Sequence, residues 1–180
     1  LHNQWVYLIQ KNGSSSLRVQ QSRENLAVFT NDEISALDCV DVYIRNPRAI
    51  RPWQHVIEPI VGYLILGAKI AQNPSQYSMP FNFGPNSNDA LPVVEMVKLA
   101  LNCWGKGSYE LIKIAHQPHE ANLLKLDISQ AIKVLDWKPQ MNALEAINKT
   151  ISWYKAFEED ESCISSFTSS QIINHLQSYK

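Results

Sequence analysis

The sequence predicts an α/β fold from residue 42 onward, and two patterns carry this prediction. Short apolar runs that are typical of strands, beginning with residues 42–44, alternate with longer segments that keep one apolar face at helical spacing. Glycine, proline and asparagine separate these segments where turns are expected. Residues 1–41 show no clear period, so we divide the chain into a poorly determined segment, 1–41, and one lobe, 42–180.

The first helix of the lobe is expected to reach about residue 72, because Pro59 suits a first helical turn and the apolar residues that follow share one face. Residues 81–84 are predicted to form a short strand that stops at a proline turn. A second helix is expected at 93–104, followed by a strand within 109–114. A glycine stands directly after this second helix, where a C-terminal cap is expected.

Three helices are expected in the last third of the chain. Asp127 is the predicted N-cap of a short amphipathic helix, and Asn142 is the predicted N-cap of a longer one. The acidic run 158–161 is predicted to be a solvated linker. Thr168 or Ser169 is expected to cap the last short helix.

The composition excludes several classes of function. A chain of 180 residues with a net charge of −1 can build one domain with a core, and this charge excludes a nucleic-acid protein that works through overall positive charge. No apolar run approaches the length of a membrane span, and no signal peptide is visible. The three cysteines are far apart and are expected to be reduced thiols in a cytoplasmic protein. Because the chain begins at Leu1, we expect a fragment.

The run 45–56 carries three arginines and one histidine between a strand-like segment and a helix. Arginine presents a planar fork of donors that matches phosphate oxygens, so the run predicts a site for an anionic ligand. The alternative is a solvated surface loop. Pro47, Pro52 and Trp53 favour the anion site, because stiff and bulky residues hold arginines in place.

Two other patterns match known sites only in their spacing. His116 and His119 have the spacing of metal ligands on a helix, but Pro118 lies between them, so a metal site is not expected. A loop that presents His119 and Glu120 to a polar ligand and a plain surface loop both stay open.

The catalytic Tyr-x-x-x-Lys spacing of short-chain dehydrogenases occurs twice, at Tyr7/Lys11 and at Tyr109/Lys113. The first match runs into Asn12 and Gly13, and the second lies on a predicted strand, so we interpret both as chance. No Gly-x-Gly-x-x-Gly loop for a dinucleotide is present in the sequence.

The run 44–59 resembles the signature of the CDP-glucose 4,6-dehydratases, nucleotide-sugar enzymes of the extended short-chain dehydrogenase superfamily. Asp136 departs from the glycine that this family usually has before the following tryptophan, so a helix cap is expected to be weaker here. Further segments match the family in the same order: 81–85, 118–121, 124–127, 137–139 and 150–154.

The resemblance implies the carboxy-terminal substrate-binding lobe of a Rossmann-type α/β nucleotide-sugar enzyme, with the dinucleotide-binding half largely absent. The family converts CDP-glucose to CDP-4-keto-6-deoxyglucose with NAD, a step in dideoxysugar and O-antigen synthesis. The resemblance therefore implies a CDP-sugar as ligand, NAD held in the missing half, and a homodimer in the complete enzyme. We expect the 180-residue polypeptide alone to bind NAD weakly or not at all and to show no dehydratase turnover.

The resemblance implies substrate-binding residues but no catalytic residue, cofactor-binding residue or metal ligand in this chain. Arg51 aligns with the arginine that binds the substrate diphosphate, and Arg45 and Asn46 border the nucleotide base and ribose. Asn82 lies near that pocket, while His119 and Glu120 belong to a loop that closes over the diphosphate and sugar. The alternatives are another nucleotide-sugar epimerase or dehydratase, and a non-catalytic nucleotide-sugar-binding or interaction remnant.

Overall fold

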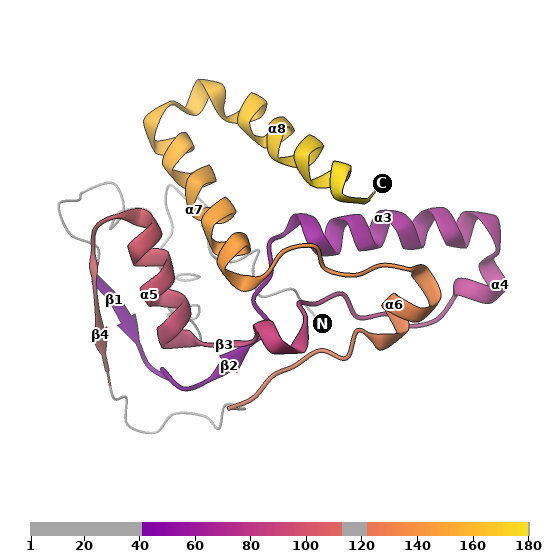
Figure 1. Cartoon of the computed structure of the whole chain (residues 1–180), viewed down its shortest axis with the longest axis horizontal. Coiled ribbons are helices and arrows are strands. Elements are labelled where there is room, and N and C mark those ends of the chain that lie inside the picture. Colours follow the sequence, from indigo (N-terminus) through magenta and orange to yellow (C-terminus); the bar gives the residue numbers. More distant parts are fainter. Residues whose placement is uncertain (1–40, 113–121, 180) are drawn as a thin grey trace, which may run out of the picture. The chain divides into compact units, whose positions relative to one another are not determined.

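The computed structural model describes residues 41–112 and 122–179, and these divide between two compact units (Figure 1). Of the described residues, unit 1 comprises 41–49, 92–112 and 122, and unit 2 comprises 50–91 and 123–179. The strands are β1 (Asp41–Ile44), β2 (Ile50–Arg51), β3 (Leu91–Pro92) and β4 (Ser108–Leu111). The helices are α3 (Ile57–Gln72), α4 (Pro74–Tyr77), α5 (Val93–Trp104), α6 (Ser129–Leu135), α7 (Ala143–Glu159) and α8 (Ile164–Leu176), with short 3-10 turns η1 (Ser87–Asp89), η2 (Glu161–Cys163) and η3 (Gln177–Tyr179).

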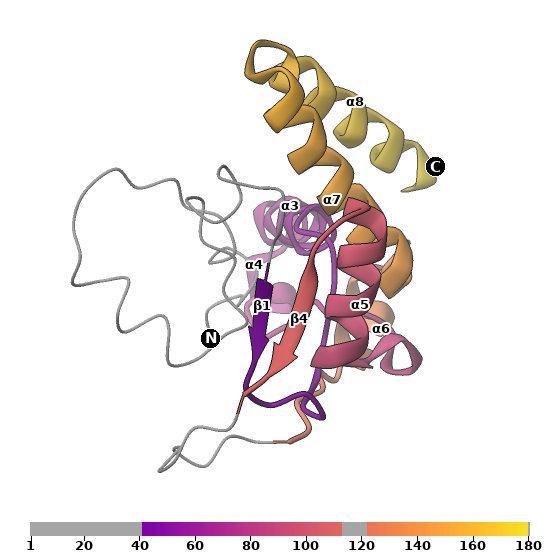
Figure 2. The ribbon, with the colours of Figure 1, turned by 90° about the vertical axis from the view of Figure 1, so that its left-hand side faces the viewer.

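Unit 1 is built on a parallel pair of strands with a helix on one face (Figure 2). β1 pairs with β4 in a register that sets Val42 opposite Tyr109 and Ile44 opposite Leu111. Val42 and Ile44 are buried, as are three residues on one face of α5 that recur at helical spacing: Met96, Val97 and Ala100. This arrangement confirms the strand predicted at 42–44 and the helix predicted at 93–104. The strand predicted within 109–114 is present as β4, which begins one residue earlier and ends at Leu111.

The loop after β1 is fastened to the start of α5. The amide of Val93 donates to the carbonyl of Ala49 at 2.9 Å, and the amide of Val94 donates to the carbonyl of Pro47 at 3.1 Å. These bonds satisfy first-turn amides that a helix leaves without partners. At the other end of α5, Gly105 adopts a φ of 90° and donates its amide to Leu101, as the cap prediction requires.

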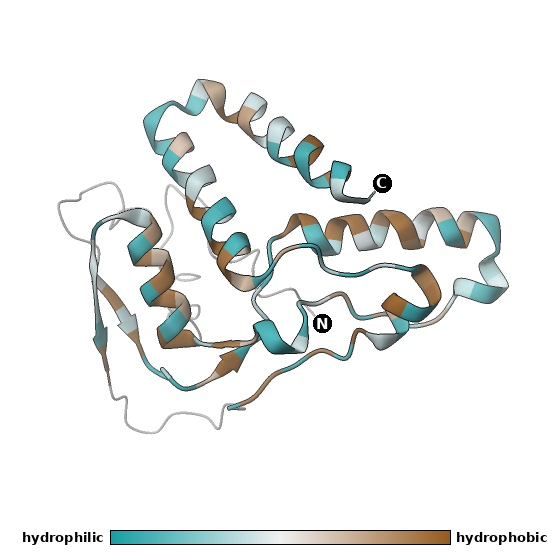
Figure 3. Cartoon of the chain, viewed as in Figure 1, coloured by the Kyte–Doolittle hydropathy of each residue, from teal (hydrophilic) through white to brown (hydrophobic). Residues whose placement is uncertain are grey.

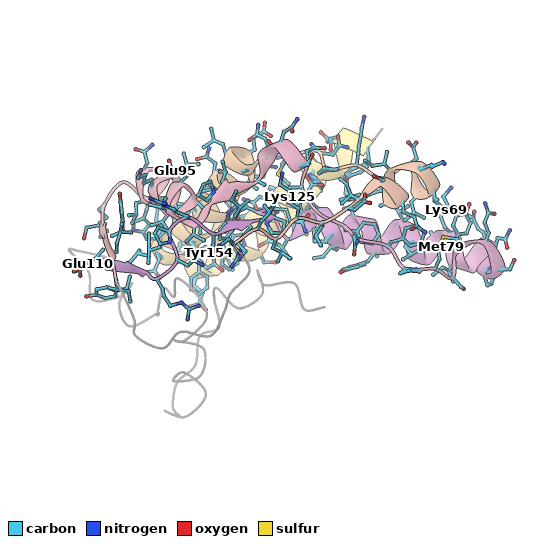
Figure 4. All side chains as sticks on the ribbon, turned by 90° about the horizontal axis from the view of Figure 1, so that it is seen from below. Lys69, Met79, Glu95, Glu110, Lys125 and Tyr154 are labelled. Carbon is cyan, nitrogen blue, oxygen red and sulfur yellow. The ribbon has the colours of Figure 1, made fainter. Side chains whose placement is uncertain are left out.

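Unit 2 packs α3, α6 and the segments between them around two adjoining apolar clusters. The larger cluster comprises Phe83, Ile128, Ala131, Leu135 and Trp137, and the smaller comprises Ile57, Val61 and Met141. Ile65 and Tyr179 contact both clusters. The hydropathy view shows apolar residues along much of α3 (Figure 3). In the last turn of α3, Lys69 Nζ lies 5.9 Å from the centre of the Tyr77 ring in α4, and Figure 4 labels this lysine.

α3 carries apolar side chains on its outer face as well as on its core face. Val61 is buried, whereas Ile60 and Leu64 are 46% and 66% exposed. A helix with apolar residues on both faces is typical of the interior of a larger protein. The outer face of α3 is therefore suited to contact further polypeptide.

The strand predicted at 81–84 is wrong, because the structure assigns no strand to these residues. The carbonyl of Phe83 accepts a hydrogen bond from the Gln54 side chain at 2.9 Å instead of from a neighbouring strand. The ring of Phe83 fits between Trp137 and Tyr63, with ring-centre distances of 5.0 Å and 5.2 Å. Packing of this ring and one side-chain bond thus fix an extended segment without a β-ladder.

The C-terminal third confirms one predicted cap and corrects two other predictions. Asn142 caps α7 through a capping box with Glu145, as expected. The acidic run is not a linker, because Glu158 and Glu159 complete α7 and Asp160 accepts from the amide of Ser162 at the start of η2. The run 158–161 is nevertheless exposed to solvent.

The last helix begins earlier than predicted. α8 starts at Ile164, and Thr168 and Ser169 lie inside it. Their hydroxyls donate to carbonyls four residues earlier, at 2.8 Å and 2.9 Å, which is the bond that serine and threonine make in a helix interior. The predicted cap is therefore wrong, because the same hydroxyl finds an acceptor in the preceding turn.

The short helix α6 ends at a residue that is not suited to its backbone conformation. Asp136 has a φ of 56°, which is left-handed and costs about 1 kcal/mol for a residue with a Cβ. We expect Asp136→Gly to raise the free energy of unfolding by about 1 kcal/mol in urea titrations. Lys133→Gly, in the interior of the same helix, should lower it by a similar amount. A loss of stability in both variants would contradict this account of the cap.

Candidate functional site

Arg51 lies on β2, and its backbone is held from two sides within unit 2. β2 pairs with β3 on one side, and on the other Ile50 forms a parallel bridge with Leu123. The amide of Leu124 donates to the carbonyl of Ile50 at 3.1 Å. The guanidinium of Arg51 is half-buried and donates through Nη1 to the same carbonyl at 3.0 Å. Arg51 is thus a cation on a fixed backbone.

The two residues that follow Pro52 fasten the arginine run to other segments of unit 2. Trp53 Nε1 donates to the carbonyl of Leu91 at 2.8 Å, and Gln54 Nε2 donates to the carbonyl of Phe83 at 2.9 Å. Gln54 is only 5% exposed, so its bond is shielded from water. This is the rigidity that the stiff and bulky residues of the run predict, and Trp53 supplies it through its indole N–H.

The predicted site residues fall into three groups. Arg45 and Asn46 follow β1 in unit 1, where the carbonyl of Asn46 accepts from the amide of Ala49 at 3.2 Å. Arg51 and Asn82 belong to unit 2. The substrate-binding roles of all of them stay predictions. His119 and Glu120 lie outside the described residues. So do both residues of the Tyr7/Lys11 match and Lys113 of the Tyr109/Lys113 match.

Asn82 is exposed and already makes one contact with the protein. Its Nδ2 donates to the carbonyl of Asp127 at 3.1 Å, and the Asp127 carboxylate accepts from the amide of Ser129 at 2.9 Å. Asp127 therefore stabilises the first turn of α6, but its prediction as the N-cap is wrong by one residue, because Ile128 stands at that position. Asn82 is tied to this turn through its amide nitrogen.

The sequence analysis missed a buried carboxylate directly after the arginine run. Glu58 in the first turn of α3 is 1% exposed, and its Oε1 accepts from the amides of Gln140 and Met141 at 2.9 Å and 2.8 Å. Its Oε2 accepts from the Tyr179 hydroxyl at 3.2 Å and lies 3.8 Å from His175 Nε2. Glu58 thus joins three distant segments of unit 2. Its position in a first helical turn did not indicate a buried residue, since acidic residues are common there.

Burial and charge shift the pKa values of the groups in this cluster. Burial raises the pKa of Glu58, although its hydrogen-bond donors oppose the change. Burial, with a smaller contribution from Lys149, lowers the pKa of His175, so this ring is neutral at pH 7 and its contact with Glu58 is not an ion pair there. Burial, followed by Lys149 and His175, lowers the pKa of His55 from 6.5 to about 4.

The low pKa of His55 predicts acid sensitivity. The unfolded chain binds a proton at His55 below pH 6.5, whereas the folded chain does not until about pH 4, so the contribution of His55 is complete above 6.5 and is lost as the pH falls to 4. At about 1.4 kcal/mol per pH unit, this loss amounts to about 3 kcal/mol. The lowered pKa of His175 also makes the folded state less stable as the pH falls. The raised pKa of Glu58 has the opposite effect on stability.

His55→Asn isolates this contribution, because the asparagine oxygen can replace the Nδ1 that accepts from the amide of Ile57 at 3.3 Å. Urea unfolding at pH 7, 6, 5 and 4 should show the wild type losing about 3 kcal/mol more than the variant. The same pH dependence in both proteins would contradict the assignment to His55.

The described residues give no sign of a metal centre or a membrane anchor. Within 41–112 and 122–179, no group of three histidine, cysteine, aspartate or glutamate residues is placed to hold a metal ion. No helix in this part of the chain is long and apolar enough to cross a membrane. Cys163 is an exposed thiol.

No protein-family model matches the chain, but a curated protein does. CDP-glucose 4,6-dehydratase of Salmonella typhimurium (strain LT2) is 38% identical over 120 residues, which are 67% of this chain and 33% of that protein. The predicted resemblance to CDP-glucose 4,6-dehydratase is confirmed. The chain thus spans about a third of the length of the CDP-glucose 4,6-dehydratase that it matches.

Solved structures support the predicted fold class. dTDP-glucose 4,6-dehydratase from Bacillus anthracis, solved with NAD, aligns with 72% of this chain and 38% of its own at a TM-score of 0.52 and 18% identity. UDP-glucose-4-epimerase from Stenotrophomonas maltophila, solved with NAD and formylated UDP-arabinopyranose, aligns with 71% of this chain and 38% of its own at a TM-score of 0.56 and 15% identity. Like the match to CDP-glucose 4,6-dehydratase, both cover part of a larger α/β enzyme of this fold.

Proposed function

We propose that this chain is the substrate-holding part of a nucleotide-sugar 4,6-dehydratase that acts on CDP-glucose. The observation that carries the proposal is the 38% identity with CDP-glucose 4,6-dehydratase over 120 residues. The reaction is the conversion of CDP-glucose to CDP-4-keto-6-deoxyglucose in dideoxysugar and O-antigen synthesis. A cytoplasmic location and a homodimeric complete enzyme belong to the same proposal.

In this proposal Arg51 binds the diphosphate of the CDP-sugar. Its backbone is fixed by β3 and by the segment at Leu123, and its side chain is half-buried, so little conformational freedom is lost when a ligand binds. Arg48, three residues earlier, is exposed. The planar fork of one preorganised arginine suits two phosphate oxygens. Arg45 and Asn46 are assigned to the base and ribose, and His119 and Glu120 to the closing loop.

The residues of this chain do not fit NAD. β1 is followed by Arg45, Asn46 and Pro47, whereas a dinucleotide site needs glycines that let the backbone approach the pyrophosphate. In this proposal the complete enzyme uses NAD to take and return a hydride. The role of this chain is to bind and orient the sugar nucleotide.

Nucleotide selectivity tests the proposal against a related epimerase or dehydratase. The purified chain is titrated by calorimetry with CDP, UDP and dTDP under one buffer condition. We expect CDP to bind at least about tenfold more tightly than the other two, which corresponds to about 1.4 kcal/mol. Tighter binding of UDP or dTDP would contradict the CDP assignment, and turnover of CDP-glucose by the chain with NAD would contradict the division of roles.

A further inference from the structure

We propose that Gln54 and Trp53 are positioning residues that hold Arg51 and Asn82 at a fixed separation, so that one CDP-sugar contacts both side chains. This inference rests on the proposed function and adds two residues to the site. Neither side chain is assigned to the ligand. Each acts through the segment that it fastens to the arginine run.

Two hydrogen bonds connect the arginine run to the segment that carries Asn82. The segment that begins with Asn82 and ends at Leu91 is bonded to the arginine run near both ends. Gln54 Nε2 donates to the carbonyl of Phe83, the residue next to Asn82, and Trp53 Nε1 donates to the carbonyl of Leu91. Because two bonds hold the segment, it can neither rotate nor slide along the arginine run, and the position of Asn82 is set relative to Arg51.

Fold stability alone does not account for a glutamine at position 54. Gln54 is 5% exposed, and its Oε1 has no hydrogen-bond partner among the described residues. A buried amide with an unpaired acceptor is less favourable than an apolar side chain of similar volume. What the amide provides, and methionine or leucine does not, is a directional bond to the carbonyl of Phe83.

Arg51 and Asn82, at the two ends of this connection, are themselves fixed. The carbonyl of Arg51 accepts from the amide of Trp53 at 3.1 Å, which folds the run back directly after the arginine. Asn82 is held through Nδ2 to Asp127. The ring of Phe83 is 5% exposed and packs against Trp137. A change at Gln54 therefore acts on a chain of well-packed groups between Arg51 and Asn82.

The test compares CDP with inorganic pyrophosphate in Gln54→Met and Trp53→Phe variants of the whole chain. In this proposal pyrophosphate contacts Arg51 alone, whereas CDP contacts Asn82 as well. We expect each variant to bind CDP about tenfold more weakly than the wild type and pyrophosphate within about twofold of it. Gln140→Met is the matched control, because it removes an exposed amide that donates to the carbonyl of Lys138.

Each outcome decides the proposal. Equal weakening of CDP and pyrophosphate would mean that the two side chains only stabilise the fold, and unchanged CDP binding would mean that they position nothing; either result overturns the inference. If Gln54→Met does not fold by circular dichroism, Trp53→Phe, which keeps an aromatic ring, decides alone. If the wild type binds pyrophosphate but shows no extra affinity for CDP, the proposed function fails and the inference falls with it.

Discussion

Gly62→Ala is expected to lower the free energy of unfolding by about 3 kcal/mol or more. A Cβ at this position would lie within 2.6 Å of Phe83 Cε1 and 2.9 Å of Phe83 Cγ. The ring of Phe83 is 5% exposed and is held against Trp137, so it has little room to move away. The clash involves a backbone-attached atom, and no rotamer change at residue 62 relieves it.

Gly67→Ala in the same helix is the matched control. Nothing lies within 4 Å of a Cβ built at Gly67, so this substitution should stabilise the chain by about 0.5–1 kcal/mol through the higher helix propensity of alanine. Urea unfolding of both variants measures the difference. A Phe83→Ala background should remove most of the penalty at Gly62. Equal effects at the two glycines would show that α3 does not approach Phe83 as described.

The helices of this fold were predictable where their signals are local. The apolar spacing of α5 and the glycine at its end act within one helix, and Asn142 with Glu145 forms a capping box within three residues. The segment at Phe83 was not predictable in this way, because its conformation depends on a bond from Gln54, which is 29 residues away in the sequence. The start of α8 was misplaced because Thr168 finds its acceptor inside the helix.

The candidate site shows the same division. The chemistry of the arginine run and the value of Trp53 as a rigid neighbour follow from residue types that are adjacent in sequence. Glu58 could not be recognised as a buried residue, because its partners at Gln140, Met141 and Tyr179 lie 82 to 121 residues away. Long-range contacts of this kind leave no period in the sequence.

In the proposed function, Arg51 binds the diphosphate of a CDP-sugar. Arg51→Ala and Arg48→Ala remove the same charge three residues apart, so any difference between them reports position and not net charge. Losing a desolvated arginine contact with a diphosphate costs about 2–5 kcal/mol, which abolishes measurable CDP binding from a moderate affinity. Loss of an exposed arginine such as Arg48 changes binding little.

The measurement is calorimetric titration of CDP into the wild type and the two variants at one ionic strength, with circular dichroism to confirm that each is folded. We expect binding by the wild type, nearly unchanged binding by Arg48→Ala and none detectable by Arg51→Ala. Equal weakening in the two variants, or full CDP binding by Arg51→Ala, would contradict it.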